Sequence, residues 1–311
     1  LEQLRKAGAV LPGDKPRVQN PGVPDESQPL NHVPQFAAPA ADGDHAAPEL
    51  RAVSKTVQLD LTALSASGFV TPGSPRSVTT DQYRVIKRPL LENAMGKGAS
   101  LVTNGNLIMV TSALPGEGKS FTAINLAMSL AMELDHTVML VDADVTRPSV
   151  MSKLGLPPAA GLLDMLRGGQ TKLADVLLRT NVEGLTLLPA GLPHDRATEL
   201  LASDAMTDLL DEMSKRYSDR IIIFDSPPLL LTTEARVLAN HMGQVVVVVR
   251  AEKTLQSEVE HALSTIEACP IKLLVLNQVR SQGLGAHGYG YGYGHGGYGR
   301  ATEERMPAAA A

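Results

Sequence analysis

The sequence of 311 residues contains no tryptophan, one cysteine and few aromatic residues. Because Cys269 has no second cysteine to pair with, an internal disulfide and a cysteine-based zinc site are both excluded. Aromatic residues make up 3% of the chain and hydrophobic residues 43%, so a large core must be mainly aliphatic. This composition fits a reducing, cytoplasmic setting.

Long hydrophobic runs and excess positive charge are missing too. The longest purely aliphatic run covers residues 245–249. A membrane-spanning helix needs ~18–20 apolar residues, so we expect no direct membrane insertion. The net charge of −5 argues against a general nucleic-acid binder, which depends on contacts to phosphate groups.

Composition divides the chain into three zones. Residues 1–75 hold ten of the 21 prolines and show no helical or strand period, which predicts a disordered Pro/Ala-rich arm. Residues 76–280 alternate short apolar runs with helical patterns and form the predicted domain. Residues 281–311 include nine glycines between positions 283 and 299, which predicts a flexible Gly/Tyr-rich tail.

The middle zone has the pattern of an α/β fold. Several of its apolar runs are continuously hydrophobic, as strands buried on both faces should be. Residues 119–134 carry a helical stripe of apolar side chains. Strands that alternate with helices predict a mostly parallel sheet flanked by helices. The expected strands are 107–111, 138–141, 185–188, 221–224, 245–249 and 273–276.

Residues 112–120 read SALPGEGKS and nearly match the phosphate-binding pattern G-x-x-x-x-G-K-[ST], with Ala113 in place of the first glycine. A predicted strand precedes this segment and a predicted helix follows it, as phosphate binding requires. The plain alternative is a tight turn with an exposed lysine. We favour an ATP and Mg²⁺ site, with Lys119 at the β- and γ-phosphates and the Ser120 hydroxyl at the metal. The expected nucleotide contacts are Gly116, Glu117, Gly118, Lys119, Ser120 and Phe121.

Carboxylates follow two of the predicted strands. Asp142 and Asp144 come after residues 138–141, and Asp225 comes after residues 221–224. The carboxyl ends of parallel strands meet at one sheet edge, so we expect all three beside the phosphate-binding loop. Two residues apart in an extended segment, Asp142 and Asp144 should share a face. Arg147 either steadies phosphate charge or forms a structural pair; both readings stay open.

Three segments in this order, SALPGEGKS, VDADVTRP and IIIFDSPP, resemble the Walker A, Walker A′ and Walker B motifs of bacterial tyrosine autokinases (BY-kinases). TELLAS at 198–203 and the segment at 275–277 also resemble family segments, and the likeness covers about residues 79–300. The resemblance implies a P-loop NTPase-like (MinD/ParA-like) fold and a kinase domain at 76–280. It is strongest to stand-alone cytoplasmic kinases of exopolysaccharide synthesis clusters.

Site residues follow from the resemblance. Lys119, Asp142, Asp144 and Asp225 would be the catalytic set, with Asp142 the expected base. Ser120, Asp142 and Asp225 would bind the metal. Arg147 and Asn277 would join the nucleotide contacts, with Asn277 at the position that reads adenine in related ATPases. Asp81, Arg84 and Lys87 resemble an E-x-x-R-x-x-R helix that builds rings of subunits, although Asp and Lys replace two residues of that pattern. Pro89 should kink or end this helix.

The tail supplies the expected acceptors. A phenol with a pKa near ~10 needs a carboxylate base and Mg²⁺ to attack at neutral pH. We therefore expect a non-specific protein-tyrosine kinase that autophosphorylates its tail between subunits and regulates exopolysaccharide synthesis or export. The implied partners are a membrane chain-length or export-type activator, which would hold the kinase at the inner face of the membrane, other copies of the chain, and a tyrosine phosphatase. The expected phosphorylation sites are Tyr289, Tyr291, Tyr293 and Tyr298.

Two other functions compete with this one. A MinD/ParA-type ATPase switch would control localisation or assembly without phosphorylating tyrosine. Such switches carry a signature lysine where this chain has Leu114, and they have no use for a tyrosine tail. A non-catalytic scaffold would be expected to have lost its metal ligands, and all of them are present.

Overall fold

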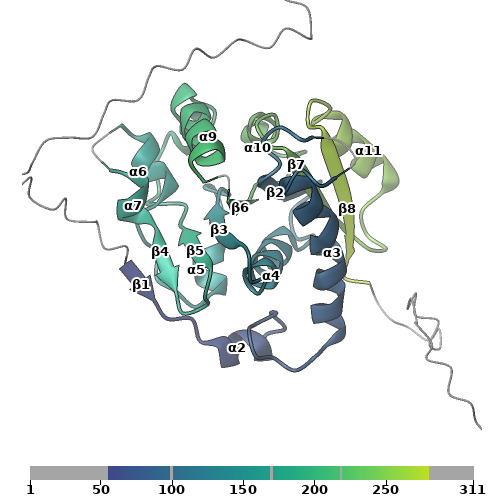
Figure 1. Cartoon of the computed structure of the whole chain (residues 1–311). Coiled ribbons are helices and arrows are strands. Elements are labelled where there is room, and N and C mark those ends of the chain that lie inside the picture. Colours follow the sequence, from purple (N-terminus) through teal and green to yellow (C-terminus); the bar gives the residue numbers. More distant parts are fainter. Residues whose placement is uncertain (1–54, 99–100, 169–170, 218, 280–311) are drawn as a thin grey trace, which may run out of the picture. The chain divides into compact units, whose positions relative to one another are not determined.

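Eight strands form a single sheet in the order β1-β4-β5-β3-β6-β2-β7-β8 (Figure 1). The computed structural model describes residues 55–98, 101–168, 171–217 and 219–279. All neighbouring strands run parallel except β4 and β5, which are antiparallel. The strands are β1 (Lys55–Val57), β2 (Leu107–Ser112), β3 (Thr137–Asp142), β4 (Leu178–Thr180), β5 (Leu185–Leu188), β6 (Arg220–Asp225), β7 (Gln244–Arg250) and β8 (Ile271–Asn277).

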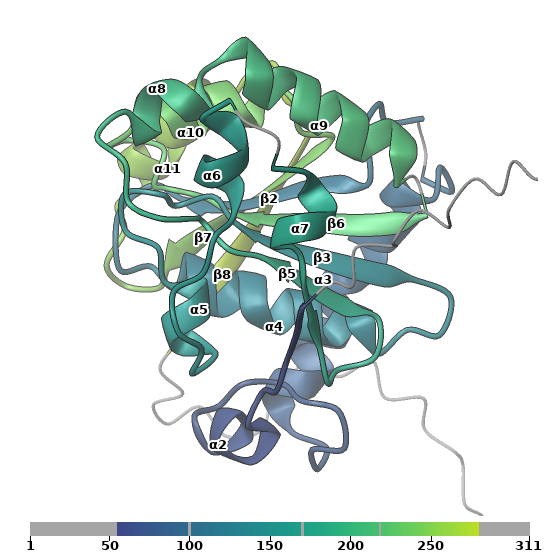
Figure 2. The same ribbon diagram turned by 90° about the vertical axis from the view of Figure 1, so that its left-hand side faces the viewer.

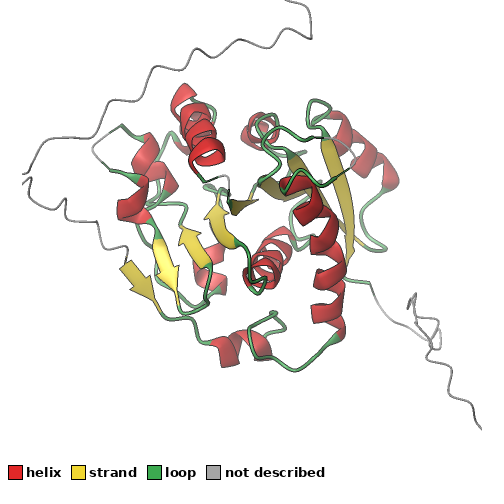
Figure 3. Ribbon diagram, in the orientation of Figure 1, coloured by secondary structure: helices red, strands yellow, loops and turns green. Residues whose placement is uncertain are grey.

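Helices cover both faces of the sheet (Figures 2 and 3). Alternate residues of β2 point to opposite faces, so Ile108 joins one hydrophobic cluster and Met109 the other. One cluster includes residues of α2 (Leu61–Ala66), α3 (Val78–Ala94), α4 (Lys119–Ala131) and α5 (Val150–Lys153). The other includes residues of α6 (Leu162–Leu166), α7 (Leu173–Val176), α8 (Ala197–Leu201), α9 (Asp204–Arg216), α10 (Thr233–Ala239) and α11 (Gln256–Ser264).

The predicted fold class, a mostly parallel sheet flanked by helices, is confirmed. All six expected strands are present as β2, β3, β5, β6, β7 and β8. Every residue of β2 is buried, which explains its continuous apolar run. The sequence did not reveal β1 and β4, because each has three residues and includes exposed polar side chains. Within the described ranges no helix combines the length and the apolar character needed to cross a membrane.

The domain begins earlier than the expected residue 76. The segment 55–75, which we had assigned to the arm, forms β1, α2 and a loop that packs on the sheet. Leu59, Leu64 and Val70 are buried, and the side-chain amide of Asn181 bonds both the N–H and the carbonyl of Leu59, at 2.8 and 3.1 Å. These few apolar residues are irregularly spaced in the sequence, so they show no helical or strand period. They are buried because they pack against residues of later segments of the chain. Residues 1–54 of the arm lie outside the described residues.

Helix α3 continues through Pro89 to Ala94, so of the two expected effects of the proline an end is wrong, and a kink stays a prediction. Proline removes one backbone hydrogen bond, which here would involve the carbonyl of Val85. Both Pro89 and Val85 are exposed, on the solvent side of the helix. On the opposite side, Leu90 and Leu91 are buried and hold the helix against the sheet.

Candidate active site

The loop between β2 and α4 has the backbone conformation that its glycines predict. Gly116 and Gly118 have φ angles of +81° and +98°, in the left-handed region that favours glycine. A Cβ on Gly118 would also lie 2.1 Å from the Asn277 amide nitrogen. Helix α4 then begins at Lys119, so its first N–H groups face the loop. This strand–loop–helix geometry suits a bound phosphate.

Lys119 lies at the centre of the site. Its Nζ is 2.6 Å from Oδ2 of Asp144 and 4.0 Å from Oδ1 of Asp225, and its side chain is 12% exposed. Beside it is a cavity of about 560 Å³, also lined by Gly116, Asp144 and Arg147. This volume falls within the ~300–1,000 Å³ of sites for drug-sized ligands. We call this space the P-loop cavity.

Asp142 and Asp225 end the neighbouring strands β3 and β6 and are fully buried. Oδ2 of Asp142 accepts bonds from the backbone N–H groups of Ser149 and Val150, both at 3.0 Å. Within the described part of the chain, Oδ1 of Asp142 and both oxygens of Asp225 have no hydrogen-bond partner. Burial, with the negative charge of Asp225 as a second cause, raises the pKa of Asp142 to about 7. Burial also raises the pKa of Asp225 to about 6, against the opposing charge of Lys119.

These orphaned oxygens fit a hard cation. Buried carboxylate oxygens without partners are costly unless a proton, a donor or a metal satisfies them. The Ser120 hydroxyl lies nearby and accepts a hydrogen bond from the Ser149 hydroxyl at 2.9 Å. The part of the chain described here has no cluster of three or more acidic, histidine or cysteine side chains able to hold a metal. Mg²⁺ is bound by one or two carboxylates together with waters and substrate phosphates, so this set suits it.

The expectation that Asp142 and Asp144 share a face is wrong. Strand β3 ends at Asp142, and Asp144 belongs to the following turn. Asp144 lines the P-loop cavity, whereas Asp142 lines a separate apolar pocket. Oδ1 of Asp144 accepts bonds from the Thr146 hydroxyl and the Arg147 N–H at 3.1 and 3.2 Å. Arg147 lines the P-loop cavity, and its side chain forms no salt bridge with any described residue.

Glu117 points away from the loop interior. Its carboxylate is buried and accepts bonds from the Leu114 N–H at 2.7 Å, the Arg250 N–H at 3.4 Å and the Thr254 hydroxyl. The side chain therefore ties the P-loop to the turn between β7 and α11. The sequence could not reveal Thr254, because it lies 137 positions away and belongs to no motif. Ser149 was missed too, although it directly follows the Walker A′ segment.

The end of β8 also contacts the P-loop. The Asn277 amide donates to the Glu117 carbonyl at 2.9 Å, and the Gln278 amide donates to the Gly116 carbonyl at 3.1 Å. Asn277 therefore lies beside the loop, as its predicted role requires. The Phe121 ring does not line the P-loop cavity; its centroid is 5.0 Å from that of Phe69.

The predicted oligomer helix is only partly exposed. Asp81 pairs with Arg76 and Arg84 on the solvent side of α3, at 3.1 and 3.0 Å. Lys87 is buried, and its Nζ lies 2.6 Å from both the Ser129 carbonyl and a Glu133 carboxylate oxygen. The prediction that Lys87 belongs to an exposed interface is wrong, because this side chain joins α3 to α4. Tyr289, Tyr291, Tyr293 and Tyr298 lie outside the described residues.

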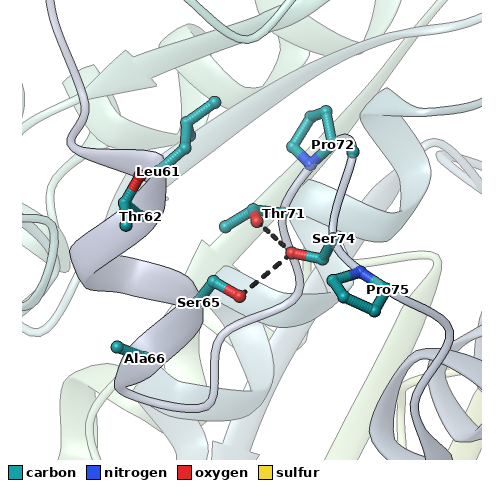
Figure 4. A pocket seen from close by; sticks show the side chains of 9 residues that line it. Leu61, Thr62, Ser65, Ala66, Thr71, Pro72, Ser74 and Pro75 are labelled. Carbon is teal, nitrogen blue, oxygen red and sulfur yellow. Dashed lines mark hydrogen bonds between the residues drawn. The ribbon is translucent and has the colours of Figure 1, made fainter.

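A further cavity of about 460 Å³ lies between α2 and the loop at 71–75, and none of the candidate site residues lines it (Figure 4). The Ser74 hydroxyl bonds the hydroxyls of Ser65 and Thr71 there, the former at 3.1 Å. None of the described residues that line it is charged. These features give it no role in phosphate chemistry.

Comparison with known proteins agrees with this geometry. The family model described as an AAA domain matches residues 105–274. "Tyrosine-protein kinase YwqD" of Bacillus subtilis is 32% identical over 200 residues, which cover 64% of this chain and 80% of the relative. "Tyrosine-protein kinase ptk" of Acinetobacter johnsonii is 34% identical over 182 residues, which cover 58% of this chain but 24% of the relative. The crystal structure of the chimerical protein CapA2B2 aligns with a TM-score of 0.55 and 29% identity, over 70% of this chain and 98% of that one.

Proposed function

The chain belongs to the family of bacterial tyrosine-protein kinases, and on this premise we propose that it transfers the γ-phosphoryl group of ATP to tyrosines of its own C-terminal segment. The observation that carries the proposal is the meeting of one lysine, one hydroxyl and three carboxylates at a single sheet edge. Lys119 and Ser120 come from the P-loop, Asp142 and Asp144 from β3 and its following turn, and Asp225 from β6.

In the proposed complex the triphosphate lies in the P-loop cavity. Lys119 exchanges its contact with Asp144 for the β- and γ-phosphates, and the backbone N–H groups at the start of α4 face the same anion. Ser120 and Asp225 are the proposed ligands of Mg²⁺, which supplies charge neutralisation when bound. Arg147 has no structural salt bridge within the described residues, which supports a role at the phosphates rather than a structural one.

The transfer step needs a base. The phenol oxygen forms a bond to the γ-phosphorus while the bond from that phosphorus to the bridging oxygen of ADP breaks. The phenol proton moves to Asp142, whose pKa of about 7 suits proton transfer near neutral pH. The acceptors would be Tyr289, Tyr291, Tyr293 and Tyr298, separated by glycines that add little bulk.

The biological setting follows from the motif resemblance. We assign the chain to the control of exopolysaccharide synthesis or export, at the inner face of the membrane through a membrane-bound activator. Transfer between subunits would use the exposed side of α3, where Asp81 and Arg84 lie. Lys87 has no part in that contact.

Mass spectrometry of the purified full chain after incubation with Mg-ATP tests the proposal. We expect phosphotyrosine at one or more of the four tail tyrosines, and none in Lys119→Met. Turnover of ATP with unmodified tyrosines would instead identify an ATPase switch. Phosphotyrosine that persists in Lys119→Met would show that another site or a contaminating kinase is responsible.

A further inference from the structure

We infer that a narrow pocket beside Asp142 binds the aromatic ring of the acceptor tyrosine. This inference rests on the proposed function. We call the pocket the proline slot, because Pro148, Pro158, Pro189 and Pro193 line it. It lies where α5 and the chain after it face the loop that follows β5, and Met151 and Asp142 form its inner wall.

The size of the slot selects a small ligand. Its volume is about 220 Å³, less than half the volume of the P-loop cavity and below the ~300–1,000 Å³ of drug-sized sites. A nucleotide would therefore occupy the P-loop cavity. The slot suits a group no larger than a single ring.

The chemistry of the slot selects a phenol. Among the described residues that line it, Asp142 is the only charged one and Ser152 has the only other polar side chain. An anionic ligand would be repelled by Asp142 and by the adjacent Asp225. A phenol is neutral below a pKa of ~10, presents two flat apolar faces, and carries one proton donor. Oδ1 of Asp142 is a buried acceptor that has no partner among the described residues, so a donor of this kind would satisfy it.

The slot is held in shape before any ligand arrives. Its wall at Pro189 and Ala190 accepts hydrogen bonds from the Leu162 and Leu163 N–H groups at 2.8 and 2.9 Å. Gly161 permits this contact, because a Cβ there would lie 1.9 Å from the Pro189 carbonyl oxygen. A fixed apolar wall lowers the entropy lost on binding a ring.

Residues at the end of β3 and just after it line both cavities. Asp144 lines the P-loop cavity and Asp142 lines the slot, although the two residues are two positions apart. A ring in the slot would place its hydroxyl near Asp142, the proposed base. In this proposal Asp144 lies beside the nucleotide and Asp142 lies beside the acceptor tyrosine.

Substitution of one lining residue tests the slot. In Ala159→Phe a ring supplied by the chain would fill the slot, whereas Ala160→Phe adds the same ring at the next position, which is exposed and does not line it. The probe is the synthetic peptide GYGYGYG, phosphorylated in trans by the full chain. We expect the KM for the peptide to rise about ten-fold or more in Ala159→Phe, because ring burial is lost, and to stay unchanged in Ala160→Phe.

The outcomes separate the slot from the function. Equal peptide KM values in the two variants would overturn the slot while leaving the kinase assignment intact. A parallel loss of ATP affinity in Ala159→Phe would also overturn it, because the substitution would then act through the P-loop cavity. If wild-type chain binds the peptide without phosphorylating it, and Ala159→Phe does not bind it, the slot stands and the proposed function fails. Peptide binding is followed by fluorine NMR of a 3-fluorotyrosine version, without ATP.

Discussion

The ammonium group of Lys119 lies 2.6 Å from Oδ2 of Asp144, so the P-loop lysine already has an anionic partner inside the fold. Both side chains are largely buried, with 12% and 4% of their surfaces exposed. A nucleotide must therefore compete with a carboxylate for this lysine.

Removal of the competing charge should strengthen nucleotide binding. We expect Asp144→Asn to lower the Kd for ADP about three- to ten-fold in EDTA, because one negative charge beside the phosphates is lost. Equilibrium titration with a fluorescent ADP analogue measures this, with Asp208→Asn on the surface helix α9 as the control. An unchanged or weaker affinity would mean that Asp144 holds Lys119 in place for the phosphates rather than opposing them.

Asp142 should make the stability of the nucleotide-free protein depend on pH. Its pKa rises from an ordinary 3.8 to about 7 in the fold, so the native state holds the proton more tightly than the unfolded chain does. The corresponding stability is fully present below pH ~4 and is lost as pH rises through 7. Asn is neutral throughout and can still accept the Ser149 and Val150 N–H bonds.

Asp142→Asn should therefore be more stable than wild type at pH 8, by a few kcal/mol at most, on the order of the pKa shift. The difference should shrink steadily between pH 7 and pH 4. Urea unfolding at several pH values, in EDTA, measures it. Parallel curves for the two proteins across this range would contradict the raised pKa.

The pair of buried Lys87 and half-buried Glu133 should stabilise the contact of α3 with the C-terminal end of α4. The hydrogen bond from Lys87 is the main cause of a lowered pKa for Glu133. We expect Glu133→Gln to lower the free energy of unfolding by about 1–3 kcal/mol at pH 7, because the Lys87 charge loses its partner. This difference in unfolding free energy should disappear when the pH falls below 4.5, the ordinary pKa of Glu133, because acid then protonates Glu133 in the wild type as well.

The matched control is Glu212→Gln, since Glu212 forms an exposed pair with Arg216 on α9. Exposed pairs contribute little, so this variant should resemble wild type at every pH. Chemical unfolding followed by circular dichroism compares them. If both glutamine variants behave alike, the buried pair has no special value.

Thr254 should influence ATP binding although it belongs to no nucleotide motif. Its hydroxyl bonds the buried carboxylate of Glu117, which also bonds the N–H of Leu114 in the P-loop. We expect Thr254→Val to raise the KM for ATP about ten-fold with kcat within about two-fold, because a charged hydrogen-bond acceptor loses one donor. Thr254→Ser should restore the KM.

Thr180→Val is the control for Thr254, because the Thr180 hydroxyl bonds backbone groups near β4, far from the loop. It should reduce thermal stability without a change in KM. If Thr254→Val lowers thermal stability and leaves the KM for ATP unchanged, the bond from Thr254 to Glu117 only stabilises the fold.

The sequence predicted the central sheet and the phosphate loop well because both depend on local signals. Strand β6 contains a continuous apolar run, IIIF at 221–224, and the glycines of the loop are needed at left-handed φ angles. Asp142, Asp144 and Asp225 could be placed at one edge from strand direction alone. The sequence could not show that Asp142 and Asp144 line different cavities, because this depends on the residue at which β3 ends.

Contacts between distant segments were beyond the sequence. The bond between Thr254 and Glu117 spans 137 positions, and the clamp of Asn181 on Leu59 spans 122. Lys87 was misread for the same reason. Nothing in the sequence of α3 marks Lys87 as the side chain that turns inward. The position of its two partners explains it: the Ser129 carbonyl on α4 and Glu133 just after that helix.

The contact of Asn277 and Gln278 with the P-loop fixes the point from which the C-terminal segment, the proposed acceptor, extends. Tyr289 lies ten positions beyond Val279, a fully extended reach of about 33–36 Å. The ends of β8 and β3 are four strand spacings apart, or about 19 Å. The linker is therefore long enough for Tyr289 to reach the proposed active site of its own subunit. A short flexible linker of this kind gives the tethered group an effective concentration in the millimolar range. Transfer of phosphate between neighbouring subunits therefore has to compete with transfer to the tyrosine of the same subunit.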